Sequence, residues 1–318
     1  MLSHVFKFLT RLASPAGPNA SLHIFIFHRV LDKPDSLMPY EPDVIRFEKI
    51  IKAVSNVYNV ISLDEAVKRM CTRTLPSRAA CITFDDGYQD NLRNALPILN
   101  KYDVPATVFV ATEFMHGGMM WNDVVYECVR FFDGAISLET LGQKLIVPTA
   151  TTEKLSLLSS FIPEIKHLDQ AFRQEIVDEL VSKTAFKMSP KMMSKCEVIQ
   201  LSRSRGMAIG AHTRTHPILA MVGIDCARDE IKGSKEDLQA LLGQEVTLFA
   251  YPNGKPGEDY LPEHVAVVKE AGFKAAVSTV DSIACQTDSS YELPRYSPWD
   301  VNIAKFLSRS YLEVIKSR

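Results

Sequence analysis

Two adjacent carboxylates, Asp85 and Asp86, directly follow an apolar segment and precede Gly87. The apolar segment, residues 80–84, is typical of a buried strand, and α/β barrels place their active sites at the carboxyl ends of their strands. Neighbouring residues in a strand point to opposite faces, so one site receives both carboxylates only if the chain bends, and Gly87 permits a bend. Asp-Gly is also a common turn dipeptide, so a turn without chemistry is the alternative.

His212 and His216 follow a second apolar segment, residues 207–211. Two histidines four residues apart converge on one face if the backbone makes a helical turn, and neutral imidazoles bind zinc and similar divalent metals. A pair of surface histidines is the alternative. Together with one carboxylate, the two histidines would form a three-ligand metal site with open positions, which is the pattern of a catalytic metal, and the second carboxylate would remain as a base.

Two further segments end in the same way. Pro252, Asn253 and Gly254 follow the apolar segment 246–251 and form a strong turn signal, which either is only a turn or aims a backbone N–H into the site. His28 follows the apolar segment 22–27, and histidine suits proton donation because its pKa lies near neutrality. The alternative for His28 is a residue that closes a core strand and bonds to backbone.

These segments belong to an alternation of strands and helices, which predicts a parallel sheet. We expect an α/β fold, a (β/α) barrel of about seven strands, at residues 22–27, 59–62, 80–84, 106–111, 207–211, 246–251 and 274–278. Amphipathic helices are expected at 44–54, 91–100, 228–242 and 260–271. Residues 121–205 interrupt the alternation as a mostly helical insertion, which either covers the barrel mouth or is a peripheral subdomain. The expected organisation is an amphipathic segment over residues 1–20 and a barrel domain over 21–318.

Composition narrows the classes of partner and location. The net charge of -2 gives no basic field for nucleic acid. The six cysteines are scattered without a C-x-x-C pair, which favours a reducing compartment and hence a cytoplasmic location. Leu2, Val5, Phe6, Leu9 and Leu12 share one helical face near the N-terminus. This segment is either an interfacial helix that gives peripheral membrane contact or a terminal helix packed on the domain.

The three motifs, Thr83 to Gly87, His212 to His216 and Phe249 to Gly254, occur in an order that resembles the polysaccharide deacetylase family, carbohydrate esterase family 4 or the NodB-homology domain. The resemblance implies a distorted barrel, Asp85 as the base, and Asp86, His212 and His216 as ligands of a divalent metal. Zinc is the family's usual metal, and an N-acetylated sugar in a glycan is its typical substrate. Tyr251 and Asn253, in the third motif, are candidate substrate and oxyanion contacts.

The chain departs from the family pattern in two places. Ala250 stands where the family often has an arginine that steadies the catalytic aspartate, and we expect Arg295 to replace it through a bidentate pair with Asp85. No histidine follows His264, so the family's late general acid is missing. A branch of the family that deacetylates poly-N-acetylglucosamine is similar at His28, because its acid histidine comes from the N-terminal strand.

The resulting expectation is a metal-dependent hydrolase that removes the N-acetyl group from an amino sugar in a glycan or glycan precursor. Trp121 and Trp299, the only tryptophans, are candidates for stacking on a sugar ring or for packing alone. Two alternatives remain open: a catalytically inactive glycan-binding relative, and a deacylase of a lipid-linked sugar.

Overall fold

The computed structural model describes residues 2–184 and 186–316. The ends of the predicted domains at residues 1 and 318, residue 185 of the predicted insertion, and the Leu2 side chain fall outside this range.

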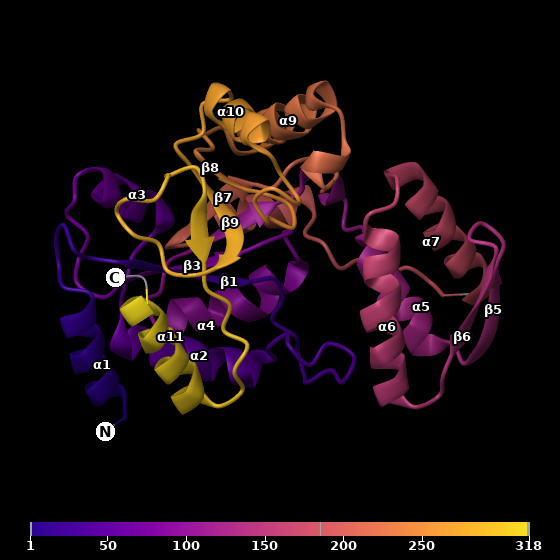
Figure 1. Cartoon of the computed structure of the whole chain (residues 1–318), viewed down its shortest axis with the longest axis horizontal. Coiled ribbons are helices and arrows are strands. Elements are labelled where there is room, and N and C mark those ends of the chain that lie inside the picture. The colour runs from indigo at the N-terminus through magenta and orange to yellow at the C-terminus, as the bar shows by residue number, and fades with distance from the viewer. Residues whose placement is uncertain (1, 185, 317–318) are drawn as a thin grey trace.

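A nearly closed barrel of seven parallel strands forms the main body within the described residues (Figure 1). Around the barrel the strands are β1 (Leu22–Phe27), β3 (Ala79–Phe84), β4 (Ala106–Val110), β7 (Met207–Ala211), β8 (Leu248–Ala250), β9 (Ala275–Asp281) and β10 (Leu293–Arg295). Tyr296, next to β10, closes the ring by exchanging backbone hydrogen bonds with Ile24 (2.8 Å) and Ile26 (3.1 Å) of β1. The predicted fold class is therefore confirmed.

The strands differ from the expected set in two places. The expected strand at 59–62 is only the short β2 (Asn59–Val60), which pairs beside the ring with the start of β3. β10 takes its place in the ring, and it has no clear sequence signal because it is three residues long with Pro294 at its centre.

Alternation along each strand separates an inner from an outer layer of side chains. Leu22, Ile24 and Cys81 belong to a cluster inside the barrel, whereas Phe25 and Ile82 pack in the larger cluster between the sheet and its helices. Burial on both faces explains why the sequences of these strands are almost entirely apolar.

The inner layer is filled closely enough to require a glycine. At Gly210 a β-carbon would lie 2.4 Å from Cδ1 of Phe109. A larger residue would displace that ring, because protein interiors are close-packed.

Helices surround the barrel on its outer side. They are α1 (Leu2–Ala13), α2 (Val44–Val57), α3 (Leu63–Cys71), α4 (Leu96–Lys101), α8 (Lys195–Ser202), α9 (Ile224–Leu242), α10 (Pro262–Glu270) and α11 (Ile303–Lys316). The four expected helices correspond to α2, a π turn (Asn91–Ala95) continued by α4, α9 and α10. None of the helices within residues 2–184 and 186–316 combines the length and hydrophobicity needed to cross a bilayer.

A separate insertion lobe, residues 121–184, stands beside the barrel (Figure 1). It contains α5 (Trp121–Phe131), the antiparallel pair β5 (Gly134–Leu138) and β6 (Gln143–Val147), α6 (Thr151–Lys166) and α7 (Gln170–Thr184). The lobe has a hydrophobic core of its own. The hairpin was not predicted, although Ile136, Leu138, Leu145 and Val147 are its buried residues and follow a period of two.

Candidate active site

Four of the predicted site residues lie in register on the barrel's inner face. Asp85 continues the inward alternation of Cys81 and Thr83, and His28 continues that of Ile24, while His212 and Arg295 occupy inward positions at the ends of their strands. Because the strands are parallel, these ends meet at one rim.

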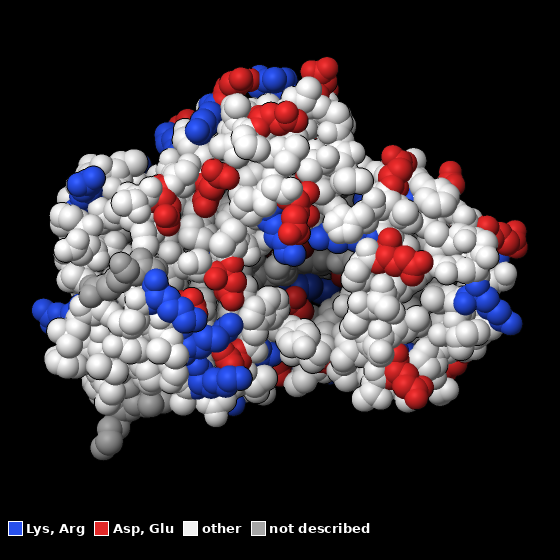
Figure 2. Space-filling model, viewed as in Figure 1, with Lys and Arg blue, Asp and Glu red and all other residues white. Residues whose placement is uncertain are grey.

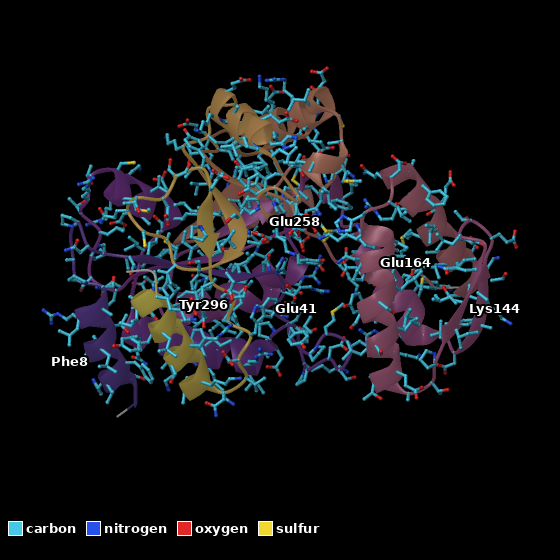
Figure 3. The ribbon with its side chains drawn as sticks, viewed as in Figure 1. Phe8, Glu41, Lys144, Glu164, Glu258 and Tyr296 are labelled. Carbon is cyan, nitrogen blue, oxygen red and sulfur yellow. The ribbon has the colours of Figure 1, made fainter. Side chains whose placement is uncertain are left out.

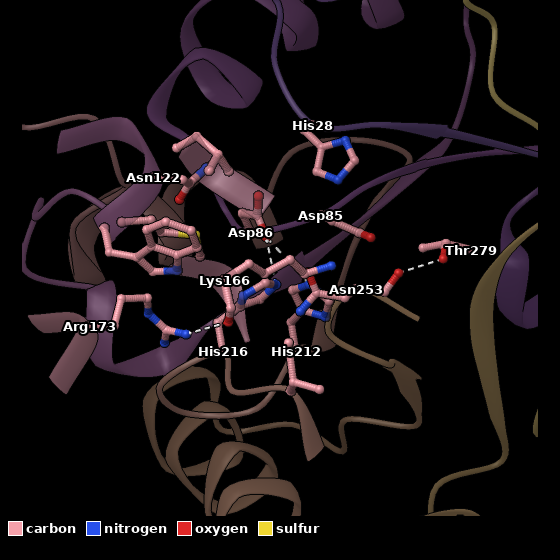
Figure 4. A pocket seen from close by; sticks show the side chains of 14 residues that line it. His28, Asp85, Asp86, Asn122, Lys166, Arg173, His212, His216, Asn253 and Thr279 are labelled. Carbon is pink, nitrogen blue, oxygen red and sulfur yellow. Dashed lines mark hydrogen bonds and ion pairs between the residues drawn. The ribbon is translucent and has the colours of Figure 1, made fainter. Parts of the chain in front are cut away.

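Between this rim and the insertion lobe lies a cavity of about 220 Å³, here called the site cavity (Figures 2 and 4). Its lining includes six of the predicted residues: His28, Asp85, Asp86, His212, His216 and Asn253. The lobe supplies Trp121, Asn122, Ile162, Lys166 and Arg173.

A sharp bend turns both aspartates into the cavity. Asp86 and Gly87 are in the left-handed region, with φ of 74° and 86°, and Gly87 N–H donates to the carbonyl of Asp85 (3.0 Å). A left-handed aspartate costs of order 1 kcal/mol, so the surrounding structure must hold it. The bend expected at this point is therefore present, and Asp86 shares it with Gly87.

Asp86, His212 and His216 form a set of metal-ligand atoms. Oδ1 of Asp86 lies 3.4 Å from Nε2 of each imidazole, and the three ligand atoms lie within 4.8 Å of one another. Tetrahedral bonds of about 2.0–2.1 Å separate neighbouring ligand atoms by about 3.3–3.4 Å, so the spacing suits zinc. His212 Nδ1 donates to the carbonyl of Ala250 (2.8 Å), which leaves the Nε2 lone pair facing Asp86. The residues present therefore fit a divalent ion.

The loop that carries the histidines is not helical. Thr213 and His216 have φ of 62° and 57°, and the Thr213 hydroxyl accepts a hydrogen bond from His216 N–H (3.1 Å). Glu230, on α9, accepts from the N–H groups of Arg214 and Thr215, both at 2.8 Å. The expected helical turn is thus wrong, and the convergence depends on Thr213 and on Glu230. Sequence spacing gave no signal for Glu230, which lies 14 residues beyond His216.

Burial and neighbouring charges have opposite effects on the pKa values of Asp86, His212 and His216. Burial alone would raise the pKa of Asp86, but the hydrogen bond to His212 and the charge of His216 hold it well below its ordinary value. Burial lowers the pKa of His216 to about 4, so this imidazole is neutral at neutral pH and able to bind a metal. Burial also acts against charge on His212, but Asp85 and Asp86 raise its pKa overall.

Arg295 makes the expected contact with Asp85. Its Nη1 and Nη2 donate to Oδ1 and Oδ2 of Asp85 at 2.7 and 2.6 Å, while its Nε donates to the carbonyl of Ser278 (2.7 Å). Both side chains are buried, with exposed fractions of 0% and 2%. Burial would raise the pKa of Asp85, but the Arg295 and His212 charges and the Arg295 hydrogen bonds lower it overall.

The third motif places its two candidate residues differently. Asn253 lines the site cavity with φ of 61°, and its N–H has no protein acceptor within the described residues. Tyr251 does not line the cavity. Because Ala250 points inward, Tyr251 points outward, where it stacks on Tyr260 (3.8 Å between ring centroids), and its N–H bonds to Val277.

His28 lies where two cavities meet. It lines the site cavity opposite the ligands in Figure 4, and also a second cavity of about 370 Å³, here called the aromatic cavity. Tyr40, Tyr126 and Trp299 line the aromatic cavity. Trp299 is 46% exposed, whereas Trp121 lines the site cavity beneath the guanidinium of Arg173. Each tryptophan therefore lines one of the two adjoining cavities.

Comparison with known sequences gives two matches. A sequence model described as "Polysaccharide deacetylase" matches residues 72–130 and 176–276. The Bacillus subtilis (strain 168) protein YxkH, which carries the provisional name of a polysaccharide deacetylase, is 33% identical over 278 residues, covering 87% of this chain and 71% of the relative. The residues matched by the family model include both aspartates and both ligand histidines, whereas His28 and Arg295 lie outside them.

Solved structures with the same fold include two neighbours. One is the Streptococcus pyogenes deacetylase PplD in complex with acetate, with a TM-score of 0.60, 19% identity and coverage of 87% of this chain and 92% of that one. The other is IcaB from Ammonifex degensii, with a TM-score of 0.59, 18% identity and coverage of 92% of this chain and 98% of that one.

Proposed function

The chain belongs to the polysaccharide deacetylase family, and from this premise we propose that it hydrolyses the N-acetyl group of an amino sugar in a glycan or glycan precursor. Asp85 is the proposed base, and Asp86, His212 and His216 are the proposed ligands of a divalent ion. We take zinc as the ion, because two imidazoles and one carboxylate suit it. When bound, such an ion lowers the pKa of water and polarises the acetyl carbonyl.

The pair with Arg295 keeps Asp85 ionised and fixed in orientation. Each carboxylate oxygen has two lone-pair directions, so one bond from Arg295 to each oxygen leaves a lone pair free to accept a proton. Arg295 is therefore a positioning residue, and it occupies the role that the family often gives to the position of Ala250.

His28 is the proposed acid that protonates the leaving amine. Its imidazole lines the same cavity as Asp85 and Asp86, on the side away from His212 and His216 (Figure 4), and this supports the role because base and acid then border the same space. The N–H of Asn253 is the proposed donor to the oxyanion, and removing one such donor costs about 3–4 kcal/mol of transition-state stabilisation. Tyr251 is not among the proposed contacts, because its hydroxyl donates to the carbonyl of Tyr291 and its N–H donates to the carbonyl of Val277.

One observation carries this proposal: the ligand set and the ion-paired base line a single cavity. The direct test is acetate release from N-acetylglucosamine oligomers by protein that is stripped with a chelator and then reloaded with zinc. Zinc-dependent release that Asp85→Asn abolishes supports the proposal. Oligomer binding without release by the zinc-loaded protein would instead indicate the inactive glycan-binding alternative.

Aromatic rings suit the neutral faces of sugars. Trp299 packs edge-to-face on Tyr40 (5.8 Å between ring centroids) at the open side of the aromatic cavity, and we propose that it stacks on a sugar next to the reacting one. Trp299→Ala should then raise KM for oligomers without changing that for a single N-acetylated sugar. An equal effect on both substrates would contradict stacking.

A second partner is suggested by α1. It packs on the domain through Thr10 and Ala13, which are buried, but leaves Val5, Phe8 and Leu12 at least half exposed. Figure 3 shows Phe8 on the outer side of α1. With Lys7 and Arg11 and no acidic residue, the helix suits an anionic membrane surface. We propose peripheral contact there, which would suit a lipid-linked sugar as substrate, and we retain the predicted cytoplasmic location as part of this proposal.

A further inference from the structure

Two cationic side chains of the insertion lobe line the site cavity but form no ion pair with Asp85 or Asp86. Lys166, at the end of α6, and Arg173, on α7, both line the cavity (Figure 4). Asp85 is paired with Arg295, and Asp86 lies between the two ligand histidines. Neither aspartate of the site therefore pairs with these two cations.

Arg173 is the more unusual of the two. Only 8% of its surface is exposed, and it takes part in no salt bridge within the described residues, although the more distant charge of Asp169 acts on it. Of its five N–H donors, Nη1 bonds to the carbonyl of Lys166 (2.9 Å). The guanidinium also lies 4.8 Å from the ring centroid of Trp121. Burial still lowers the pKa of Arg173 overall. A buried charge without a direct salt bridge is costly, so an anion supplied by a ligand would stabilise it.

Lys166 is less buried and only weakly paired. Its Nζ lies 3.9 Å from Asp259 on the barrel side, with 29% of its side chain exposed. At this distance the pair is not a hydrogen bond, and the ammonium can turn to another acceptor.

The site cavity is also small. Its volume of about 220 Å³ lies below the roughly 300–1,000 Å³ of most ligand pockets. A group that reaches Asp86 and the histidines therefore lies within reach of the two cations.

We propose that Lys166 and Arg173 form an anion subsite for a carboxylate or phosphate group carried by the reacting sugar or by its neighbour. The proposal rests on the proposed function and names the substrate class: an acidic N-acetylated glycan or a sugar phosphate. The planar guanidinium provides two parallel donors for such a group, and the ammonium adds a point charge.

Three oligomers of equal length separate the sources of the anion. One is neutral poly-N-acetylglucosamine, the second carries an ether-linked carboxylate on one sugar, and the third carries a phosphate on its reducing-end sugar. Acetate release gives kcat/KM, and calorimetry with the zinc-loaded Asp85→Asn protein gives Kd. Preference for the second oligomer indicates an acidic glycan, and preference for the third indicates a sugar phosphate.

The variants then test the residues. Arg173→Gln should reduce the preference for the anionic oligomer by about 10- to 100-fold, and Lys166→Gln by about 3- to 10-fold. Turnover of the neutral oligomer should fall less than turnover of the anionic oligomer in both variants. Arg173→Lys should restore part of the preference. Lys144→Gln, which removes a cation from the outer edge of the same lobe (Figure 3), should leave the preference unchanged.

Several results overturn the subsite. They are equal kcat/KM for all three oligomers in the wild type, and equal losses for neutral and anionic oligomers in Arg173→Gln. If Arg173→Gln does not fold, an unchanged preference in Lys166→Gln has the same meaning. If no oligomer is deacetylated, the proposed function fails, and the Kd values of the same variants still decide whether the subsite exists.

Discussion

Replacing Arg295 by methionine should destabilise the barrel far more than removing an exposed pair of the same geometry. Methionine keeps the unbranched aliphatic stem but is shorter and has no guanidinium, so the Asp85 carboxylate loses its counter-ion in a place where only 2% of it is exposed. Breaking a buried pair by removing one partner costs about 3–5 kcal/mol of folding free energy.

The matched control is Arg214→Met. Arg214 also grips an aspartate with two nitrogens, at 2.9 and 3.0 Å to Asp237, but the two side chains are 36% and 33% exposed. An exposed pair of this kind contributes about 0–1 kcal/mol. Urea unfolding in the presence of a chelator measures both variants without the stabilisation that a bound metal adds.

A double variant separates charge from packing. Asp85→Asn with Arg295→Met removes both charges, so its free energy of unfolding should exceed the value expected if the single losses were additive. If Arg295→Met costs no more than Arg214→Met, or if the double variant is simply additive, the reasoning from burial is wrong. Arg295→Lys should also lower kcat, because it keeps the charge but loses the planar fork.

Four other outcomes are expected. Replacing both His212 and His216 by alanine should abolish zinc binding together with activity, as read by metal analysis after dialysis, and full metal occupancy would refute the ligand assignment. His28→Ala should keep the metal and lose about 10²–10⁴-fold in kcat on the amide, but much less on an aryl acetate whose leaving group needs no proton; equal losses would remove His28 as the acid. His23 is fully buried, and burial lowers its pKa to about 4, below the unfolded value of about 6.5. The folded protein therefore loses up to roughly 3 kcal/mol of stability as the pH falls from about 6.5 to about 4, because the unfolded chain binds the proton more readily. Urea unfolding of His23→Gln should show a flatter pH dependence over this window, and an unchanged slope would show that His23 does not cause the loss. Phe8→Glu should reduce co-sedimentation with vesicles containing anionic lipid without changing turnover of a soluble oligomer, and unchanged sedimentation would count against membrane contact through α1.

The sequence predicted the barrel well because its core strands are buried on both faces. β1, β3 and β4 are buried at every residue and each contains a single polar residue, so their signal does not depend on a partner. β10 escaped prediction because a three-residue strand with a central proline has no periodicity, and because its place in the ring depends on Tyr296 pairing with β1. The hairpin of the insertion lobe has a signal of period two, but it lies between helices that dominate the composition around it.

The candidate site could be predicted where strand alternation fixes direction. Asp85 and Arg295 both lie at inward positions, so a contact between them follows once β10 is in the ring. Strand alternation also predicts that Tyr251 points outward, because Ala250 points inward. Tyr251 was a candidate substrate contact only because it belongs to the third motif. Glu230 could not be predicted, because α9 meets the histidine loop only through tertiary packing.

The barrel closes where Tyr296, next to β10, pairs with β1, and this late closure matters during synthesis of the chain. Asp85, Asp86, His212 and His216 are all synthesised by residue 216, yet the counter-ion of Asp85 arrives only with residue 295 of 318. A nascent or truncated chain that ends before β10 carries every family motif but leaves Asp85, the proposed base, without its partner Arg295. We therefore expect hydrolysis only from a chain that has completed the barrel. A fragment that ends before β10 should keep the motifs and lack the activity.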